Sequence, residues 1–359
     1  MLPKPQRGVL VLALAERAHP EQSACKEAAL LPNSSIPSTR QQVAVIALGG
    51  TIAMRAVDPH SGAVPDDSLT PLLEDAAFSG VTFTRLHDLP SCEIGFDHLL
   101  ELARVIEDRF REGCPGIVVT TGTDTLEEVA FALELLVRRS GPVIVTGAMR
   151  YANAIGADGP VNLLSAIIAA REPALTGAGV LVCMNEELYP ARYTRKTATH
   201  GHGFQSVPVG PVARVIEGRI LVQAELPPLP LFPIAHAAFV HKAALICAAF
   251  DDDGAAYEHL LHRPVPGLVV EALGGGHVSG AVRDVLEKLA QSIPVVIASR
   301  TGYGPTLSAS YGYRGGDIDL RRIGTIGAGL FDARKARVAL TIMLTAGCGH
   351  EEIAAFFAP

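Results

Sequence analysis

The sequence lacks tryptophan and has few aromatic residues, which make up 5% of its 359 positions. Because 48% of the residues are hydrophobic, the core must be built mainly from aliphatic side chains. There is no apolar run that approaches the roughly 18 residues of a membrane-spanning helix. The six cysteines include no C-x-x-C pair, as expected for small core residues in a reducing compartment.

The charge distribution and the missing motifs exclude several functions. The formal net charge is −7, and no basic stripe of the kind that binds nucleic acid is present. The chain has no G-x-x-x-x-G-K-[ST] phosphate loop, no H-E-x-x-H helix and no G-x-S-x-G elbow. His200 and His202 lie close together without a clear third ligand, so we expect no metal site there.

The N-terminal segment, residues 1–40, has no hydrophobic periodicity and is rich in Pro, Ser, Gln and Ala. We expect it to be a poorly ordered extension. Lys4 and Arg7 precede a short apolar run that barely reaches the length of a secretion signal. We therefore expect a cytoplasmic protein, and a periplasmic one if this segment is a signal.

Beyond residue 43, short apolar runs alternate with amphipathic segments. Strands are predicted at 43–48, 117–120, 143–147 and 180–184, and helices at 97–111 and 126–137. Strands that are apolar throughout and alternate with helices are typical of a parallel sheet with helices on both faces. Residues 212–223 predict a hairpin that turns at Glu217-Gly218.

A proline-rich stretch separates two predicted domains. Four prolines occur within residues 226–233, which favours an extended linker. Beyond it, strands are predicted at 244–248, 268–271 and 295–299, with helices near 281–291 and 333–345. We thus expect an α/β protein with a larger N-terminal domain (41–225), whose mostly parallel sheet is flanked by helices, a linker (226–238) and a smaller C-terminal α/β domain (239–359).

Polar clusters follow two of the predicted strands, at the edge where parallel sheets bind ligands. The segment LGGTIA places Thr51 after two glycines, either as a nucleophile at the strand tip or as part of a simple turn. The segment TGTDTLEE presents Thr123 and Asp124. Asp124 with Glu127 also predicts a helix capping box, so capping is the alternative to a role in substrate binding.

A third cluster, residues 192–197 (RYTRKT), carries three basic residues in a predicted loop. Such a cluster is typical of a solvated face. If the fold instead brings Lys196 beside Thr123 and Asp124, burial lowers its proton affinity and it can act as a base. The residues alone leave both interpretations open.

Taken together, the clusters resemble the bacterial-type L-asparaginase and glutaminase-asparaginase family. The matching motifs, in chain order, are residues 49–53, 121–128, 147–150, 157–163 and 192–197. The resemblance runs from about residue 43 to the C-terminus. It implies a homo-oligomer, a tetramer built from dimers, that hydrolyses the side-chain amide of L-asparagine to L-aspartate and ammonia without a metal or cofactor.

The resemblance also implies a role for each site residue. Thr51 matches the threonine that attacks the amide carbon and forms an acyl-enzyme. Thr123, Asp124 and Lys196 match the set that transfers protons, and the aspartate also binds the substrate ammonium. Ser91 fits the serine that helps to bind the α-carboxylate.

The segment after the nucleophile departs from the family. Many members carry a tyrosine in a lid here, but residues 54–70 contain none. We expect residues 55–67 to form an irregular mobile lid in which His60 or Ser61, or else a water held by the lysine, accepts the proton of the nucleophile. A glutamate that the neighbouring subunit usually supplies also has no clear counterpart around residues 303–313.

The identity of the substrate stays open. Cys92 takes the place of a glutamine that follows the substrate-binding serine in many members. The alternatives are a glutaminase-asparaginase of broader specificity and a catalytically weak amino-acid-binding homologue. A third is the ammonia-releasing subunit of a tRNA-dependent amidotransferase, which normally carries an extra N-terminal barrel.

Overall fold

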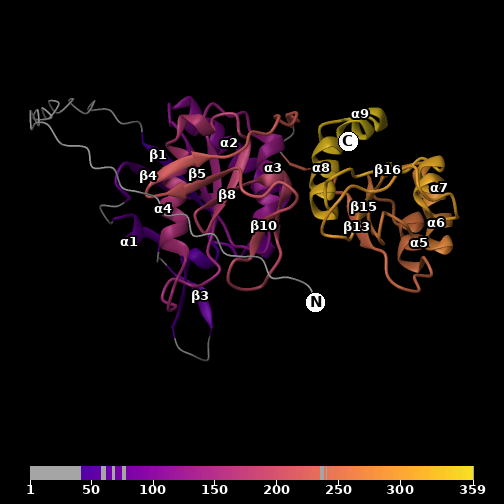
Figure 1. Ribbon diagram of the computed structural model, residues 1–359, viewed down its shortest axis with the longest axis horizontal. Coiled ribbons are helices and arrows are strands. Elements are labelled where there is room, and N and C mark those ends of the chain that lie inside the picture. Colours follow the sequence, from indigo (N-terminus) through magenta and orange to yellow (C-terminus); the bar gives the residue numbers. More distant parts are fainter. Residues whose placement is uncertain are drawn as a thin grey trace, which may run out of the picture. The chain divides into compact units, whose positions relative to one another are not determined.

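The computed structural model describes residues 42–57, 62–66, 69–74, 78–234, 238–239 and 241–358. The predicted N-terminal extension lies outside these residues, so its order stays a prediction. Figure 1 shows an N-terminal α/β domain built on a large sheet and a C-terminal α/β domain built on a smaller one. The predicted two-domain α/β fold is thereby confirmed.

The N-terminal domain is built on an eight-stranded sheet with the order β12-β11-β8-β7-β6-β5-β1-β4. The strands are β1 (Val43–Ala47), β4 (Val81–Arg85), β5 (Ile117–Thr120), β6 (Val143–Thr146), β7 (Val180–Met184), β8 (Glu187–Pro190), β11 (Ala213–Ile216) and β12 (Arg219–Val222). Parallel pairs join β7, β6, β5, β1 and β4. Antiparallel pairs add β8, β11 and β12 beyond β7. The sheet is mostly parallel, as the sequence predicts.

Helices cover both faces of this sheet. α2 (Phe96–Arg111) and α3 (Leu126–Leu136) belong to the core on one face, and α4 (Gly159–Ala170) belongs to the core on the other. Because alternate residues of a strand point to opposite faces, Ile46 of β1 packs in the first core and Val45 packs in the second. Burial on both faces is the reason that the central strands are apolar at almost every position.

A small antiparallel hairpin follows Thr51 directly. Its strands are β2 (Met54–Ala56) and β3 (Ala63–Pro65), and α1 (Leu69–Leu73) comes next. Asn153 fastens the hairpin, since its side chain accepts the Ala56 N–H at 2.9 Å and donates to the Ala56 carbonyl at 2.9 Å. The expected irregular structure of residues 55–67 is therefore wrong for the part that is described. His60 and Ser61 lie outside the described residues.

The C-terminal domain is built on a four-stranded parallel sheet with the order β13-β14-β15-β16. The strands are β13 (Ala244–Cys247), β14 (Leu268–Ala272), β15 (Val295–Ser299) and β16 (Ile326–Gly327). The helices are α5 (Ala255–His262), α6 (Gly280–Ala290), α7 (Asp317–Arg322), α8 (Ala333–Thr345) and α9 (His350–Phe357).

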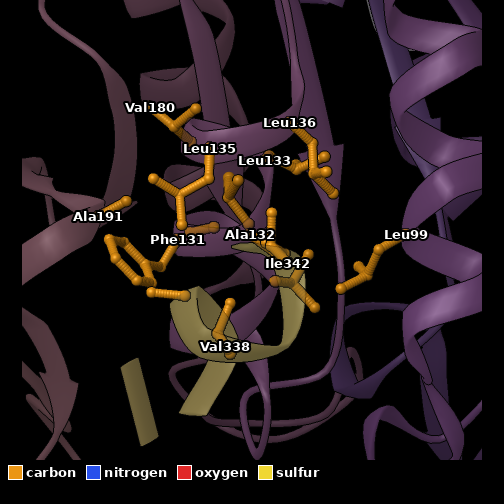
Figure 2. Packing of buried hydrophobic residues seen from close by; sticks show 14 of the residues in the cluster. Leu99, Phe131, Ala132, Leu133, Leu135, Leu136, Val180, Ala191, Val338 and Ile342 are labelled. Atoms are coloured by element: carbon orange, nitrogen blue, oxygen red, sulfur yellow. The ribbon is translucent and has the colours of Figure 1, made fainter. Parts of the chain in front are cut away.

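One hydrophobic core joins the two domains, because α8 packs against α3. Figure 2 shows Val338 and Ile342 of α8 beside Phe131 and Ala132 of α3. All four side chains are buried. A helix of the C-terminal domain is thus in direct contact with the helix that follows the second polar cluster.

The predicted hairpin after β8 is confirmed. It turns at Glu217 and Gly218, whose φ angles of 50° and 73° are the positive values that a type I′ turn requires.

The prediction that residues 192–197 form a loop is wrong. A short 3-10 helix (Ala191–Tyr193) leads into β9 (Thr194–Lys196), which pairs with β10 (Phe204–Ser206).

Candidate active site

The loops after β1 and β5 meet at the carboxyl edge of the large sheet. The backbones of Gly50 and Gly122 are in contact, since a Cβ atom at Gly50 would lie 2.2 Å from the Gly122 nitrogen. Gly50 also has a φ of 91°, which glycine adopts without strain. The close approach brings the loop that carries Thr51 against the loop that carries Thr123.

Lys196 contacts both polar residues of the second cluster. Its Nζ donates to Thr123 Oγ1 at 2.9 Å and to Asp124 Oδ1 at 2.7 Å. Thr123 is buried, whereas the side chain of Asp124 is 70% exposed. A charged carboxylate has about four acceptor positions, so Asp124 can hold the lysine and still bind a substrate ammonium.

Ser91 lies beside this group, in the short 3-10 helix Ser91–Glu93 that follows β4. Its Oγ accepts the backbone N–H of Asp124 at 3.2 Å, and its carbonyl accepts the Thr125 hydroxyl at 2.8 Å. Ser91 is buried and Cys92 is exposed. Because its hydroxyl accepts one bond, the Ser91 O–H remains available to donate to a ligand carboxylate.

Thr51 begins a short 3-10 helix, Thr51–Ala53, and is half-buried. Its hydroxyl forms no hydrogen bond to another residue in the part of the chain described. The structure brings Ser91, Thr123, Asp124 and Lys196 together through direct bonds. Thr51 is not bonded to this group in the described structure, but Gly50, the residue before it, is in backbone contact with Gly122, the residue before Thr123. Which group accepts the Thr51 proton stays a prediction.

Glu127 has a position that sequence reasoning missed. The predicted capping box of Asp124 and Glu127 is wrong, because α3 has Thr125 as its N-cap and no side-chain cap bond. Glu127 is instead 4% exposed, and its Oε2 accepts the backbone N–H of Lys196 at 2.8 Å. No local pattern signals this contact, because Glu127 and Lys196 are distant in the sequence.

The basic cluster is not a solvated face. Arg192 is 4% exposed, forms a buried ion pair with Glu134 of α3, and donates to the Pro227 carbonyl at 2.7 Å. Arg195 lies 3.6 Å from Asp332, which precedes α8. Of the two interpretations that the residues left open, the solvated face is therefore wrong, and each basic residue has its own acidic partner.

No group of three or more His, Cys, Asp or Glu side chains that could hold a metal is present among the described residues. The arrangement offers different chemistry: a hydroxyl at a strand tip, a second hydroxyl bonded to an ammonium, and an exposed carboxylate. These are the parts that nucleophilic attack on an amide and proton transfer require.

Two family models match consecutive parts of the sequence. "Asparaginase, N-terminal" matches residues 42–228, and "Glutaminase/Asparaginase C-terminal domain" matches residues 242–357. The chain belongs to the asparaginase family. The resemblance inferred from the motifs is thereby confirmed.

Relatives match this chain over both domains. It is 34% identical to the probable L-asparaginase of Deinococcus radiodurans over 327 residues, which cover 90% of this chain and 98% of that protein. It is 31% identical to the L-asparaginase of Bacillus licheniformis, over 85% of this chain and 95% of that one. The crystal structure of the probable cytoplasmic L-asparaginase from Campylobacter jejuni superposes with a TM-score of 0.79 at 26% identity, and covers 89% of this chain and 99% of that chain.

Proposed function

We propose that the protein is an L-asparagine amidohydrolase, which converts the substrate to L-aspartate and ammonia. The observation that carries the proposal is the contact of Lys196 Nζ with Thr123 Oγ1 at 2.9 Å, at the sheet edge where Thr51 is presented. The relatives from Deinococcus radiodurans and Bacillus licheniformis are named as a probable L-asparaginase and an L-asparaginase, which supports the same substrate.

Thr51 acts as the nucleophile in this proposal. Its Oγ1 attacks the carbon of the side-chain amide and forms an ester, while its proton leaves with the amide nitrogen as ammonia. A water then attacks the ester, returns a proton to the Thr51 oxygen and releases L-aspartate. Thr123 and Lys196 relay the protons, and backbone N–H groups are the expected donors to the developing oxyanion.

The substrate is held at its amino-acid end. The exposed carboxylate of Asp124 binds the α-ammonium, and the hydroxyl of Ser91 donates to the α-carboxylate. Both residues contact each other through the Asp124 N–H, so the two subsites keep a fixed separation. Cys92 follows Ser91 as a further substrate-binding residue, without the amide that a longer substrate needs.

The assembly and the compartment are proposed from the resemblance. We propose a homo-oligomer, a tetramer built from dimers, whose partner is a small-molecule substrate. None of the helices described is long and apolar enough to cross a bilayer. We propose a cytoplasmic location, and cell fractionation with and without residues 1–40 tests it.

Ammonia release from L-asparagine, L-glutamine and their D-forms tests the function. We expect turnover with L-asparagine above all, and a loss of several orders of magnitude in the Thr51→Ala variant at an unchanged circular dichroism spectrum. Wild-type turnover by Thr51→Ala would exclude Thr51 as the nucleophile. Tight binding of L-asparagine without ammonia release would favour the weak, amino-acid-binding homologue.

A further inference from the structure

A buried group of charges connects the C-terminal domain with Lys196. Lys335 of α8 is 0% exposed, and its Nζ lies 3.2 Å from Asp332 Oδ2 and 3.6 Å from Glu127 Oε2. Lysine is rarely buried unless acidic groups compensate its charge. One of the two carboxylates comes from each domain, so Lys335 links the domains electrostatically.

Glu127 extends this link to the backbone of Lys196. The Oε2 atom that faces Lys335 is the one that accepts the Lys196 N–H at 2.8 Å. The side chain of Lys196 then continues to Thr123 Oγ1. Lys335 thus orients the carboxylate that holds the backbone of the lysine in the proton relay.

Asp332 faces Arg195, the residue that precedes Lys196 in β9. The Oδ1 atom of Asp332 accepts the N–H groups of Arg334 and Lys335 at 2.9 and 3.0 Å, which makes Asp332 the N-cap of α8. Its Oδ2 atom faces Lys335 and lies 3.6 Å from Arg195 Nε. Arg195 therefore faces a carboxylate at the start of α8, and Lys196 is held by Glu127 of α3, which Lys335 of α8 faces in turn.

β9 depends on such contacts because it is a three-residue strand outside the large sheet. In the described structure it pairs with β10, a strand of equal length, and so short a ladder fixes its position weakly. We propose that Lys335 and Asp332 are positioning residues for Lys196, so that the C-terminal domain sets the geometry of the proton relay in the N-terminal domain. The inference rests on the proposed function.

Lys335→Met tests the inference, since it removes the charge and keeps an apolar side chain of similar length. We expect kcat for L-asparagine to fall about 10- to 100-fold, because a displacement of about 1 Å in a catalytic group has this effect. KM should change less than about threefold: Asp124 would lose its contact with Lys196 Nζ, but its exposed carboxylate keeps acceptor positions for the α-ammonium, and Ser91 keeps its bond to the Asp124 N–H. A kcat within about threefold of wild type would overturn the inference.

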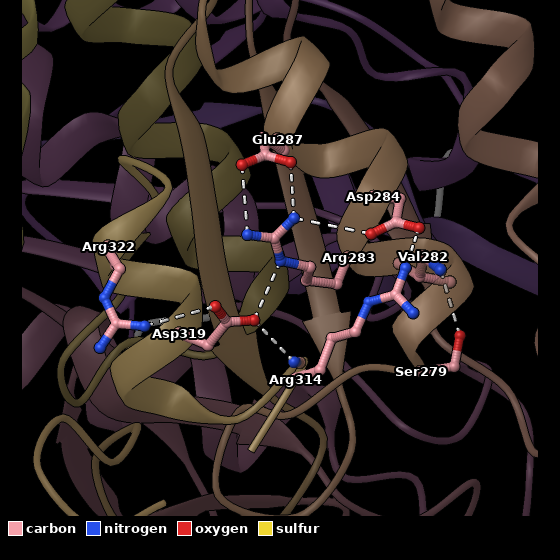
Figure 3. Close-up of polar contacts among 9 residues, drawn as sticks. Ser279, Val282, Arg283, Asp284, Glu287, Arg314, Asp319 and Arg322 are labelled. Atoms are coloured by element: carbon pink, nitrogen blue, oxygen red, sulfur yellow. Dashed lines mark hydrogen bonds and ion pairs between the residues drawn. The ribbon is translucent and has the colours of Figure 1, made fainter. Parts of the chain in front are cut away.

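Arg283→Met is the matched control for lost stability. Arg283 of α6 donates to Glu287 at 2.6 Å and to Asp319 at 2.9 Å, within the C-terminal domain (Figure 3). No hydrogen bond or ion pair joins this network to β9 among the described residues. We expect the control to lower Tm and to keep kcat per folded protein. An equal fall of kcat in both variants would make the role of Lys335 merely structural.

A crystal structure of Lys335→Met separates this inference from the proposed function. We expect the distance from Lys196 Nζ to Thr123 Oγ1, 2.9 Å in the wild type, to lengthen beyond hydrogen-bond range. An unmoved Lys196 overturns the positioning role even if the wild type hydrolyses L-asparagine. If Lys196 is displaced in the variant, the positioning role is supported. If the wild type also hydrolyses no amide, the proposed function is overturned while the positioning role stands.

A pair of Glu127 variants covers the case in which Lys335→Met does not fold. Lys335 keeps Asp332 as a partner in both, so its charge stays compensated. Glu127→Gln retains an oxygen that can accept the Lys196 N–H, whereas Glu127→Leu does not. We expect the leucine variant to lose at least about tenfold more kcat than the glutamine variant. Equal kcat values in the two variants would refute the proposal.

Discussion

Glu128→Gln should make the stability of the protein less dependent on pH. Glu128 follows Glu127 in the first turn of α3, and its Oε2 atom is buried without a hydrogen-bond partner in the described structure. Burial, reinforced by the charge of Glu127, raises the pKa of the Glu128 carboxyl to about 7, although Lys335 opposes the rise. Asp332 and Arg337 are the other charged groups that act on it.

The direction of the effect follows from proton binding. Between pH 4.5 and about 7 the native protein keeps a proton on Glu128 that the unfolded chain has released, so the free energy of unfolding falls as the pH rises. Each tenfold change in proton affinity corresponds to about 1.4 kcal/mol, so the wild type loses up to about 3 kcal/mol across this range. Glutamine has almost the same shape and does not titrate.

Urea unfolding at pH 5 and pH 8, at one protein concentration, measures this effect. We expect Glu128→Gln to gain about 1–3 kcal/mol of stability over the wild type on going from pH 5 to pH 8. The lower value allows for residual interactions of the carboxyl in the unfolded chain. The same difference between variant and wild type at both pH values would refute a buried carboxyl with a raised pKa.

Three further results are expected. Asp124→Ala should lower kcat and raise KM for L-asparagine. Its Tm should not fall as it would after the loss of a helix cap, since Thr125 is the N-cap of α3. Normal hydrolysis by the variant would refute the role of Asp124 at the site. Arg192→Met should reduce the free energy of unfolding by about 3–5 kcal/mol, because buried Glu134 loses the arginine with which it forms an ion pair. Urea unfolding measures this change, and a reduction below about 1 kcal/mol would contradict the prediction. L-Asparagine should exceed L-glutamine in kcat/KM, because Cys92 offers no amide to a longer substrate; equal values would contradict this.

The elements that follow a regular pattern could be predicted from the sequence. The central strands are apolar at nearly every position because helices bury both faces, and β5 and β7 begin and end at the predicted residues. The helix α8 also spans the predicted residues. The helix α4 was not predicted, because it is apolar on most sides and has no amphipathic period.

The site could be predicted only as far as its motifs are local. The segments around Thr51, Thr123 and Lys196 each contain their own signal, and the fold brings them to one edge of the sheet. The acceptor that Glu127 provides for the Lys196 N–H, and the charge that Lys335 provides for Glu127, depend on packing between distant segments. No spacing rule indicates such contacts.

The central claim is that Thr51 forms an ester with the substrate. Rapid mixing of the wild type with L-asparagine, an acid quench within the first turnovers, proteolysis and mass spectrometry would locate that ester. We predict an aspartyl group on the peptide that contains Thr51 and on no other peptide. An aspartyl ester on Thr123, or on any residue other than Thr51, would contradict the account.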